Sequence, residues 1–127
     1  MAKASKSRAD KKTAQINAEA IKTSAGALNK IVVCRTPSLG SAVEYLINNG
    51  VQVIAGDMRA RSMLYEIDMT LPTAIIMGSE DEGVRPHLLR KAHKWFRIPM
   101  QGTTDSFNVS VATGIVLYEA LRQRLLK

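Results

Sequence analysis

The sequence predicts an α/β domain in which helices flank a mainly parallel sheet. Short apolar runs alternate with longer segments of helical periodicity, the order that produces parallel strands joined by crossover helices. The run over residues 73–77 is continuously apolar, as in a strand covered on both faces. With 127 residues, 46% of them hydrophobic, the chain suits one domain with its own core.

The first expected elements are a helix over residues 13–23 and a strand over residues 31–35. The helix segment is weakly amphipathic, and the strand segment is a short apolar run. This run contains the single cysteine, Cys34, which excludes an internal disulfide or a cysteine-based metal cluster. Its apolar neighbours predict that Cys34 packs in the core.

A second helix and a second strand are expected next. Pro37 suits a first helical position, and the following apolar residues recur at helical spacing until Asn49 and Gly50 end the helix. Residues 51–55 are predicted to form a strand, and residues 56–70 a loop with a short turn. The side chains of this loop that we expect to pack inward are Met63, Leu64 and Ile67.

The remaining elements repeat the same alternation. They are a strand over residues 73–77, a turn over 78–83, a helix over 86–94, a strand over 95–98, a loop over 99–105 and a long helix over 106–124. We expect Asp105 or Ser106 to cap the last helix. Gly114 within that helix costs about 1 kcal/mol relative to alanine, which predicts that another group approaches it closely.

The charge of the chain indicates a polyanionic partner. The formal net charge is +7, from 18 Lys and Arg against 11 Asp and Glu, and the excess gathers in residues 1–12 and 85–97. Clustered cations release the counterions condensed on nucleic acid, which favours binding regardless of base sequence. The alternative is an ordinary charged surface that keeps a small domain in solution.

The sequence contains no membrane span or secretory signal. No apolar run approaches the roughly 18 residues that a span needs, and the charged first residues have no apolar stretch behind them. We therefore expect a cytoplasmic protein without membrane or metal partners. Residues 1–12 form a basic flexible tail in this interpretation, and residues 13–127 form the domain.

Two polar segments follow predicted strands, at the sheet edge where open α/β folds bind ligands. In the first, Gly78 and Gly83 enclose three acidic residues. The glycines permit close approach of a ligand to the backbone, and the acids favour a neutral or cationic ligand over a phosphate. The alternative is a strand-to-helix turn whose acids stabilise the helix N-terminus.

The second segment joins the sequence IPMQG, at residues 98–102, to a polar stretch that opens the last helix. Asn108 and Ser110 lie in the first turns, where unpaired N–H groups and the positive end of the helix dipole accumulate. This pattern indicates a second part of a ligand site. Packing of the helix against a neighbouring element is the alternative.

These segments resemble a known enzyme family. The sequences IIMGSEDEG, RIPMQG and DSFNVSVATGIVLYEALRQR are similar to the second and third signature motifs of the SpoU-type, or TrmH-like, branch of the SPOUT RNA 2′-O-ribose methyltransferases. The enzymes that methylate a guanosine of large-subunit ribosomal RNA are the most similar, from about Ile16 to Arg124. The resemblance implies a C-terminal trefoil knot, S-adenosyl-L-methionine as cofactor, RNA as partner and a homodimer whose active site uses both subunits.

The resemblance also implies roles for individual residues. Those placed near the reacting or knot-stabilising centre are Glu80, Ser106 and Asn108. Those expected to bind the cofactor are Met77, Gly78, Gly83, Ile98, Met100, Gly102, Phe107, Asn108 and Ser110. The basic residues assigned to RNA are Lys11, Lys12, Arg85, Arg90 and Lys91. The reaction aligns an RNA 2′-hydroxyl with the sulfonium methyl group, so positioning is expected to matter more than base catalysis.

The family's first motif, an Asn-x-Gly element followed by an arginine, has no counterpart before Ile16. We therefore expect a domain truncated at its N-terminus, with one sheet edge left to be covered and with impaired turnover as one consequence. The first hypothesis is an RNA 2′-O-methyltransferase. The second is a noncatalytic RNA-binding or dimerisation module, and the third is a nucleotide-binding α/β domain of unrelated chemistry.

Overall fold

The computed structural model describes residues 30–79, 81–101 and 108–126. The chain divides into two units, residues 1–39 and 40–127. The described part of the first unit is irregular up to the start of a helix. Within it, the Thr36 hydroxyl donates a hydrogen bond to the Ser38 carbonyl at 3.0 Å and accepts one from the Ser38 backbone N–H at 3.2 Å.

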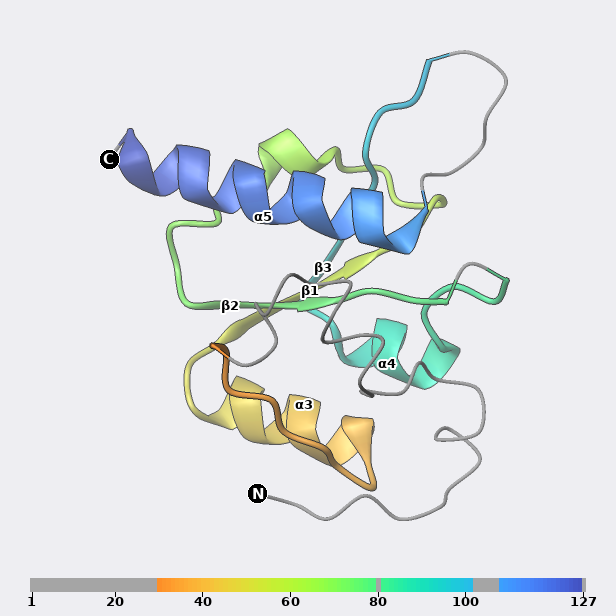
Figure 1. Ribbon diagram of the computed structural model, residues 1–127. Coiled ribbons are helices and arrows are strands. Elements are labelled where there is room, and N and C mark those ends of the chain that lie inside the picture. The colour runs from red at the N-terminus through yellow and green to blue at the C-terminus, as the bar shows by residue number, and fades with distance from the viewer. Residues whose placement is uncertain (1–29, 80, 102–107, 127) are drawn as a thin grey trace. The chain divides into compact units, whose positions relative to one another are not determined.

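A parallel three-stranded sheet organises the second unit (Figure 1). β1 (Gln52–Gly56) lies in the middle, between β2 (Thr73–Ile76) and β3 (Lys94–Phe96). Ile54 of β1 pairs with Ile75 on one side and with Lys94 on the other. The predicted α/β class with a mainly parallel sheet is confirmed.

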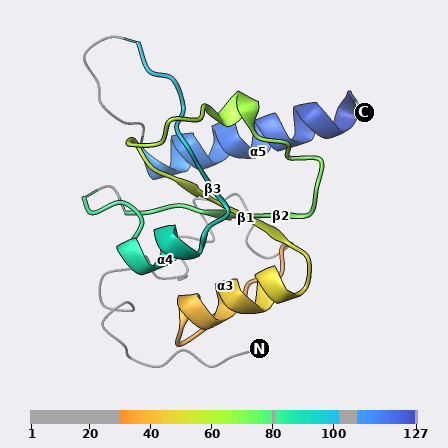
Figure 2. The same ribbon diagram turned by 180° about the vertical axis from the view of Figure 1, so that it is seen from behind.

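Helices cover both faces of this sheet. α5 (Val109–Leu125) lies on one face, with the short 3-10 helix η2 (Leu64–Glu66) beside it. α3 (Leu39–Asn48) and α4 (Pro86–Lys91) lie on the opposite face (Figure 2). The sheet is therefore the middle layer of three, as predicted for strands joined by crossover helices.

The central strand divides the core into two clusters because successive side chains of a strand point to opposite faces. Val53 and Ala55 pack with buried residues on the α3 and α4 side, which are Val43, Val84, Leu88 and Leu89. Ile54 packs on the other side with Leu64, Ile67, Met69, Phe96 and Val116. The predicted inward packing of Leu64 and Ile67 is confirmed, whereas Met63 is only half-buried.

The chain leaves α3 and enters β1 through a tight turn that contains Gly50. Gly50 adopts a φ of 81°, a left-handed conformation that glycine reaches without steric cost. The backbone N–H groups of Asn49 and Gly50 donate to the carbonyls of Leu46 and Ile47, both at 3.1 Å. The predicted end of the helix at Asn49 and Gly50 is confirmed.

Residues 31–35 do not form the predicted strand. They have no regular structure, Val32 is 92% exposed, and Cys34 is exposed instead of packed in the core. An apolar run becomes a strand only where a neighbouring strand takes up its N–H and C=O groups. Among the described residues, no strand pairs with residues 31–35.

Two helices on the α3 and α4 face are shorter than predicted. α3 begins at Leu39, so Pro37 precedes the helix and does not occupy its first position. α4 ends at Lys91 and not at residue 94, because Ala92 has extended backbone angles and Lys94 already pairs in β3.

The start of α5 also differs from the prediction. Asn108, and neither Asp105 nor Ser106, is the N-cap, and its side-chain oxygen accepts the Ser110 backbone N–H at 2.7 Å. Gly114 has no described atom within 4 Å of the position that a Cβ would take, so the predicted close approach is absent within one chain. No helix in the described ranges is long and apolar enough to cross a membrane.

Three predictions lie outside the described residues. They are the helix over residues 13–23, the basic tail over residues 1–12, and the stretch over residues 102–107, which comprises most of the loop predicted over 99–105 and the first two residues of the helix predicted over 106–124. Because that loop lies between β3 and α5, the trefoil knot stays a prediction.

Candidate functional site

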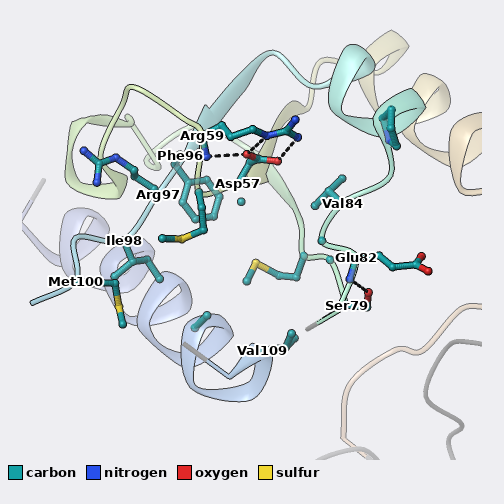
Figure 3. Close-up of a pocket in the computed structure, with 17 residues that line it drawn as sticks. Asp57, Arg59, Ser79, Glu82, Val84, Phe96, Arg97, Ile98, Met100 and Val109 are labelled. Atoms are coloured by element: carbon teal, nitrogen blue, oxygen red, sulfur yellow. Dashed lines mark hydrogen bonds and ion pairs between the residues drawn. The ribbon is translucent and has the colours of Figure 1, made fainter. Parts of the chain in front are cut away.

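A pocket of about 570 Å³ opens at the carboxyl ends of the three strands (Figure 3). Its lining comes from the ends of these strands and the segments that follow them: residues 56–59 at the end of β1, residues 77–79, 82–84 and 86 after β2, and residues 96–98 and 100 at the end of β3. Val109 and Ala112 from the first turn of α5 complete it. Parallel strands bring these segments together because all their carboxyl ends lie at one edge of the sheet.

The turn after β2 is built around a very close approach of two glycines. A Cβ at Gly78 would lie 2.0 Å from the carbonyl carbon of Gly83 and 2.2 Å from the Val84 nitrogen, so no side chain fits at position 78. The Gly83 N–H donates to the Ser79 carbonyl at 2.9 Å, and the Glu82 N–H donates to the Ser79 hydroxyl at 3.1 Å. Gly83 itself has a φ of 70°, which glycine adopts without strain.

Apolar side chains form one wall of the pocket. Ile98 and Met100 line it on the β3 side, and Val109 of α5 lies at the bottom of the view in Figure 3. Met77 and the buried Phe96 also contribute to the lining. Such a surface suits the flat, weakly polar face of a heterocycle, with the glycine turn leaving backbone groups accessible to a ligand.

The segment after β1 contributes the charged side of the pocket. Asp57 is fixed at the strand end, where its N–H donates to the Phe96 carbonyl at 2.9 Å. Its carboxylate accepts hydrogen bonds from Arg59 Nε at 2.9 Å, Arg59 Nη2 at 2.8 Å and the Arg59 backbone N–H at 2.8 Å. The side-chain hydrogen bonds from Arg59 lower the pKa of Asp57, although burial opposes the shift, and the same bonds raise the pKa of Arg59.

Arg97 ties this segment to β3. Its Nε donates to the Ala60 carbonyl at 3.1 Å, and its backbone N–H donates to the Ser62 carbonyl at 3.0 Å. Ala60 is buried, and its N–H donates to the Asp57 carbonyl at 3.0 Å. Residues 57–60 therefore form a turn that is held at both ends.

The sequence matches the SpoU rRNA Methylase family over residues 3–118. The chain belongs to this family. The expectation from the sequence motifs is thereby confirmed.

Individual relatives agree with the family match. The chain is 37% identical over 116 residues to the 23S rRNA (guanosine-2′-O-)-methyltransferase RlmB of Yersinia pestis, a region that covers 91% of this chain and 47% of the relative. Thus the chain spans about half the length of the curated relatives it matches.

Solved structures of SpoU proteins share the fold. The A. aeolicus TrmH/SpoU tRNA modifying enzyme is similar with a TM-score of 0.75 and 38% identity, over 89% of this chain and 56% of that one. The AdoMet-bound rRNA methyltransferase from Sinorhizobium meliloti is similar with a TM-score of 0.76 and 32% identity, over 83% of this chain and 40% of that one.

The structure of this SpoU chain brings together part of the predicted cofactor site. The predicted residues that line the pocket are Met77, Gly78, Gly83, Ile98 and Met100. Asn108 and Ser110 lie at the start of α5 but outside the pocket lining, where Val109 and Ala112 take their place. The predicted residues Glu80, Gly102, Ser106 and Phe107 lie outside the described ranges.

The sequence reasoning missed the segment after β1. Residues 56–59 line the pocket alongside the two motif segments. A signal was available, because residues 51–55 were predicted as a strand of the same parallel sheet, and its carboxyl end must lie at the same edge. The charged pair of Asp57 and Arg59 at that end marked it as a candidate.

The basic residues assigned to RNA lie in different environments. Arg85 is the half-buried N-cap of α4, between the pocket-lining residues Val84 and Pro86. Arg90 is exposed in the last turn of α4, and the neighbouring Lys91 forms an ion pair with Glu44 of α3. Lys11 and Lys12 lie outside the described residues.

Proposed function

We propose that this chain is the methyltransferase domain of an S-adenosyl-L-methionine-dependent RNA 2′-O-ribose methyltransferase with ribosomal RNA as its substrate. The observation that carries the proposal is the meeting of the turn at residues 77–83 and the segment at residues 98–100 in one pocket at the sheet edge. The names of the relatives support the RNA substrate, and the AdoMet-bound neighbour supports the cofactor. A cytoplasmic location belongs to the same proposal.

The residues present fit this cofactor. Met77, Ile98 and Met100 would hold the adenosine part against apolar surface, and the backbone of the glycine turn would supply hydrogen-bonding groups. A side chain at position 78 would fill this cradle, since its Cβ would overlap the Gly83 backbone. When bound, S-adenosyl-L-methionine supplies an electrophilic methyl group on a sulfonium centre.

The protein's contribution to this chemistry is chiefly alignment. A ribose hydroxyl must be held in line with the methyl group, and correct placement can contribute several kcal/mol to lowering the barrier. The predicted roles of Glu80, Ser106 and Asn108 near this centre are part of the proposal. Asn108 is supported as an organising residue because it caps the N-terminus of α5, whose residues Val109 and Ala112 line the pocket.

We also propose that two copies of the chain associate through α5. Its outward face carries Val111, Gly114, Tyr118, Leu121 and Leu125, at spacings of three and four residues that place them along one stripe. The four large side chains of this stripe are 51–74% exposed. A second copy would bury this stripe and supply the close approach that was predicted at Gly114.

Methyl transfer to ribosomal RNA tests the proposed function directly. The chain is incubated with S-adenosyl-L-methionine labelled in its methyl group and with a 23S ribosomal RNA transcript. We expect label in the RNA and, after alkaline hydrolysis, in dinucleotides, because a 2′-O-methyl group blocks cleavage at its own linkage. RNA binding that weakens with salt but never leads to incorporation of label would favour the noncatalytic RNA-binding module.

A further inference from the structure

Arg59 lies at the rim of the pocket, on the side opposite α5. Figure 3 shows it at the top of the pocket and Val109 at the bottom. Its side chain is 72% exposed, whereas that of Asp57 is 9% exposed. The pair therefore joins a fixed, nearly buried carboxylate to a guanidinium that solvent and a large ligand can reach.

Asp57 fixes the orientation of this guanidinium. The two side-chain hydrogen bonds, from Arg59 Nε and Nη2, use both carboxylate oxygens, which is the geometry of a bidentate pair. Asp57 is itself held by its N–H bond to Phe96 and by the Ala60 N–H bond to its carbonyl. The guanidinium thus loses less rotational freedom on binding a ligand than a free arginine would.

Part of the guanidinium is left for a second acceptor. Arginine has five side-chain N–H donors, and the bidentate pair uses one on Nε and one on Nη2. Among the described residues, Asp57 supplies all the hydrogen-bond acceptors of Arg59. The donors that remain match the oxygens of a phosphate group, which arginine recognises through several parallel hydrogen bonds.

We propose that Arg59, oriented by Asp57, binds a backbone phosphate of the RNA strand whose ribose enters the pocket. This inference rests on the proposed function. It assigns to Arg59 a role as an RNA-binding residue at the site itself, in addition to the basic residues of α4. The high exposure of the guanidinium, on the far side of the pocket from α5, favours a large external ligand over the bound methyl donor.

Arg61 provides a matched control for the experiment. It is exposed, lies two residues further along the same segment, carries the same charge and does not line the pocket. Arg59→Gln and Arg61→Gln therefore remove equal charge from neighbouring positions. Asp57→Asn makes the chain more positive but removes the ion pair that orients Arg59.

Binding of a radiolabelled 23S ribosomal RNA transcript to the full chain is measured by filter retention at several salt concentrations. We expect Arg59→Gln to weaken binding about five- to tenfold and to reduce the salt slope by about 0.7 to 0.9, the loss of one phosphate contact. Arg61→Gln should change the affinity by less than about twofold. Asp57→Asn should weaken binding, whereas general electrostatic attraction alone would strengthen it.

Equal effects of Arg59→Gln and Arg61→Gln, tighter binding by Asp57→Asn, or no RNA binding by the unmodified chain would each overturn the inference. Calorimetric titration with S-adenosyl-L-methionine separates this result from failure of the proposed function. If Arg59→Gln were the only variant to lose cofactor binding, Arg59 would be assigned to the cofactor and the inference would be overturned. Absence of cofactor binding in the unmodified chain would contradict the proposed function, whatever the RNA result. Thermal unfolding of each variant checks that the fold is retained.

Discussion

Gly78 approaches Gly83 so closely that a Cβ on Gly78 would lie 2.0 Å from the Gly83 carbonyl carbon. This relationship shapes the turn after β2 and leaves its backbone open toward the pocket. Gly83 differs, because a Cβ there would have no atom of the described residues within 4 Å and only its φ of 70° would be unfavourable. The two glycines are therefore needed for different reasons, one for space and the other for backbone conformation.

Gly78→Ala should strongly weaken cofactor binding. The overlap with the Gly83 backbone cannot be relieved by a flexible side chain, so the turn must move as a whole. We expect binding of S-adenosyl-L-methionine to weaken at least about tenfold, measured by calorimetry. Gly83→Ala serves as the control, with a destabilisation of about 1 to 2 kcal/mol in urea denaturation and a smaller loss of affinity. Equal binding by Gly78→Ala and the unmodified chain would contradict the described turn.

Asp57 should make stability depend on pH in the acidic range. Hydrogen bonds from Arg59 lower its pKa below the usual 3.8, so the folded state favours the charged carboxylate. This contribution is present above the unfolded-state pKa and is lost as pH falls through the folded-state pKa. Urea denaturation of the unmodified chain and of Asp57→Asn should therefore differ at neutral pH and converge in acid. A difference that grows in acid would show that the sign is wrong.

The pKa of Glu119 is also lowered, so Glu119 contributes to the pH dependence of stability with the same sign as Asp57. Its contribution must cancel in the comparison of the two proteins. A side-chain hydrogen bond from Arg122 is the main cause that lowers its pKa. Because Glu119 is present in both proteins, the difference between the two denaturation curves isolates Asp57.

Asn108 should contribute to stability as the cap of α5 and, separately, to methyl transfer. Asn108→Ala removes the acceptor for the Ser110 N–H and should destabilise the chain by about 1 kcal/mol. Asn108→Asp keeps a capping oxygen and should retain that stability. If Asn108 also acts near the reacting centre, methyl transfer by Asn108→Asp falls while its unfolding temperature does not. Unchanged transfer would leave Asn108 as a cap only.

The α5 stripe should control association. Leu121→Arg places a charge in the middle of the exposed apolar face, so we expect a shift from dimer to monomer in sedimentation velocity. Tyr45→Arg on α3 is the matched control, since Tyr45 is also a large exposed residue but lies on another helix. Dissociation by Tyr45→Arg with no effect of Leu121→Arg would place the interface elsewhere.

The periodicity of apolar residues predicted most elements of the second unit, because each of these elements buries its apolar side chains within that unit. The alternating faces of β1 and the apolar spacing of α3 each reflect local burial, so the strands at residues 51–55 and 73–77 and the helix after Pro37 were found within a few residues. The strand prediction for residues 31–35 was wrong, because apolar character alone cannot supply a partner strand.

The pocket was only partly predictable, for a related reason. The composition of the glycine turn and of the segment at residues 98–100 is enough to predict them as parts of a ligand site. Asp57 and Arg59 lie at the pocket only because the sheet order places β1 between β2 and β3. Val109 and Ala112 line the pocket in place of Asn108 and Ser110 because α5 is rotated so that Ala112 and Val116 are buried. The positions of the motifs in the sequence do not show which side of α5 faces the pocket.

Calorimetric titration of the chain with S-adenosyl-L-methionine, with ATP as the comparison ligand, tests the central claim most directly. The pocket described above predicts saturable binding of one methyl donor per chain and little or no binding of ATP. No heat and no thermal stabilisation with S-adenosyl-L-methionine, or preferential binding of ATP, would contradict a methyl-donor site at this edge of the sheet.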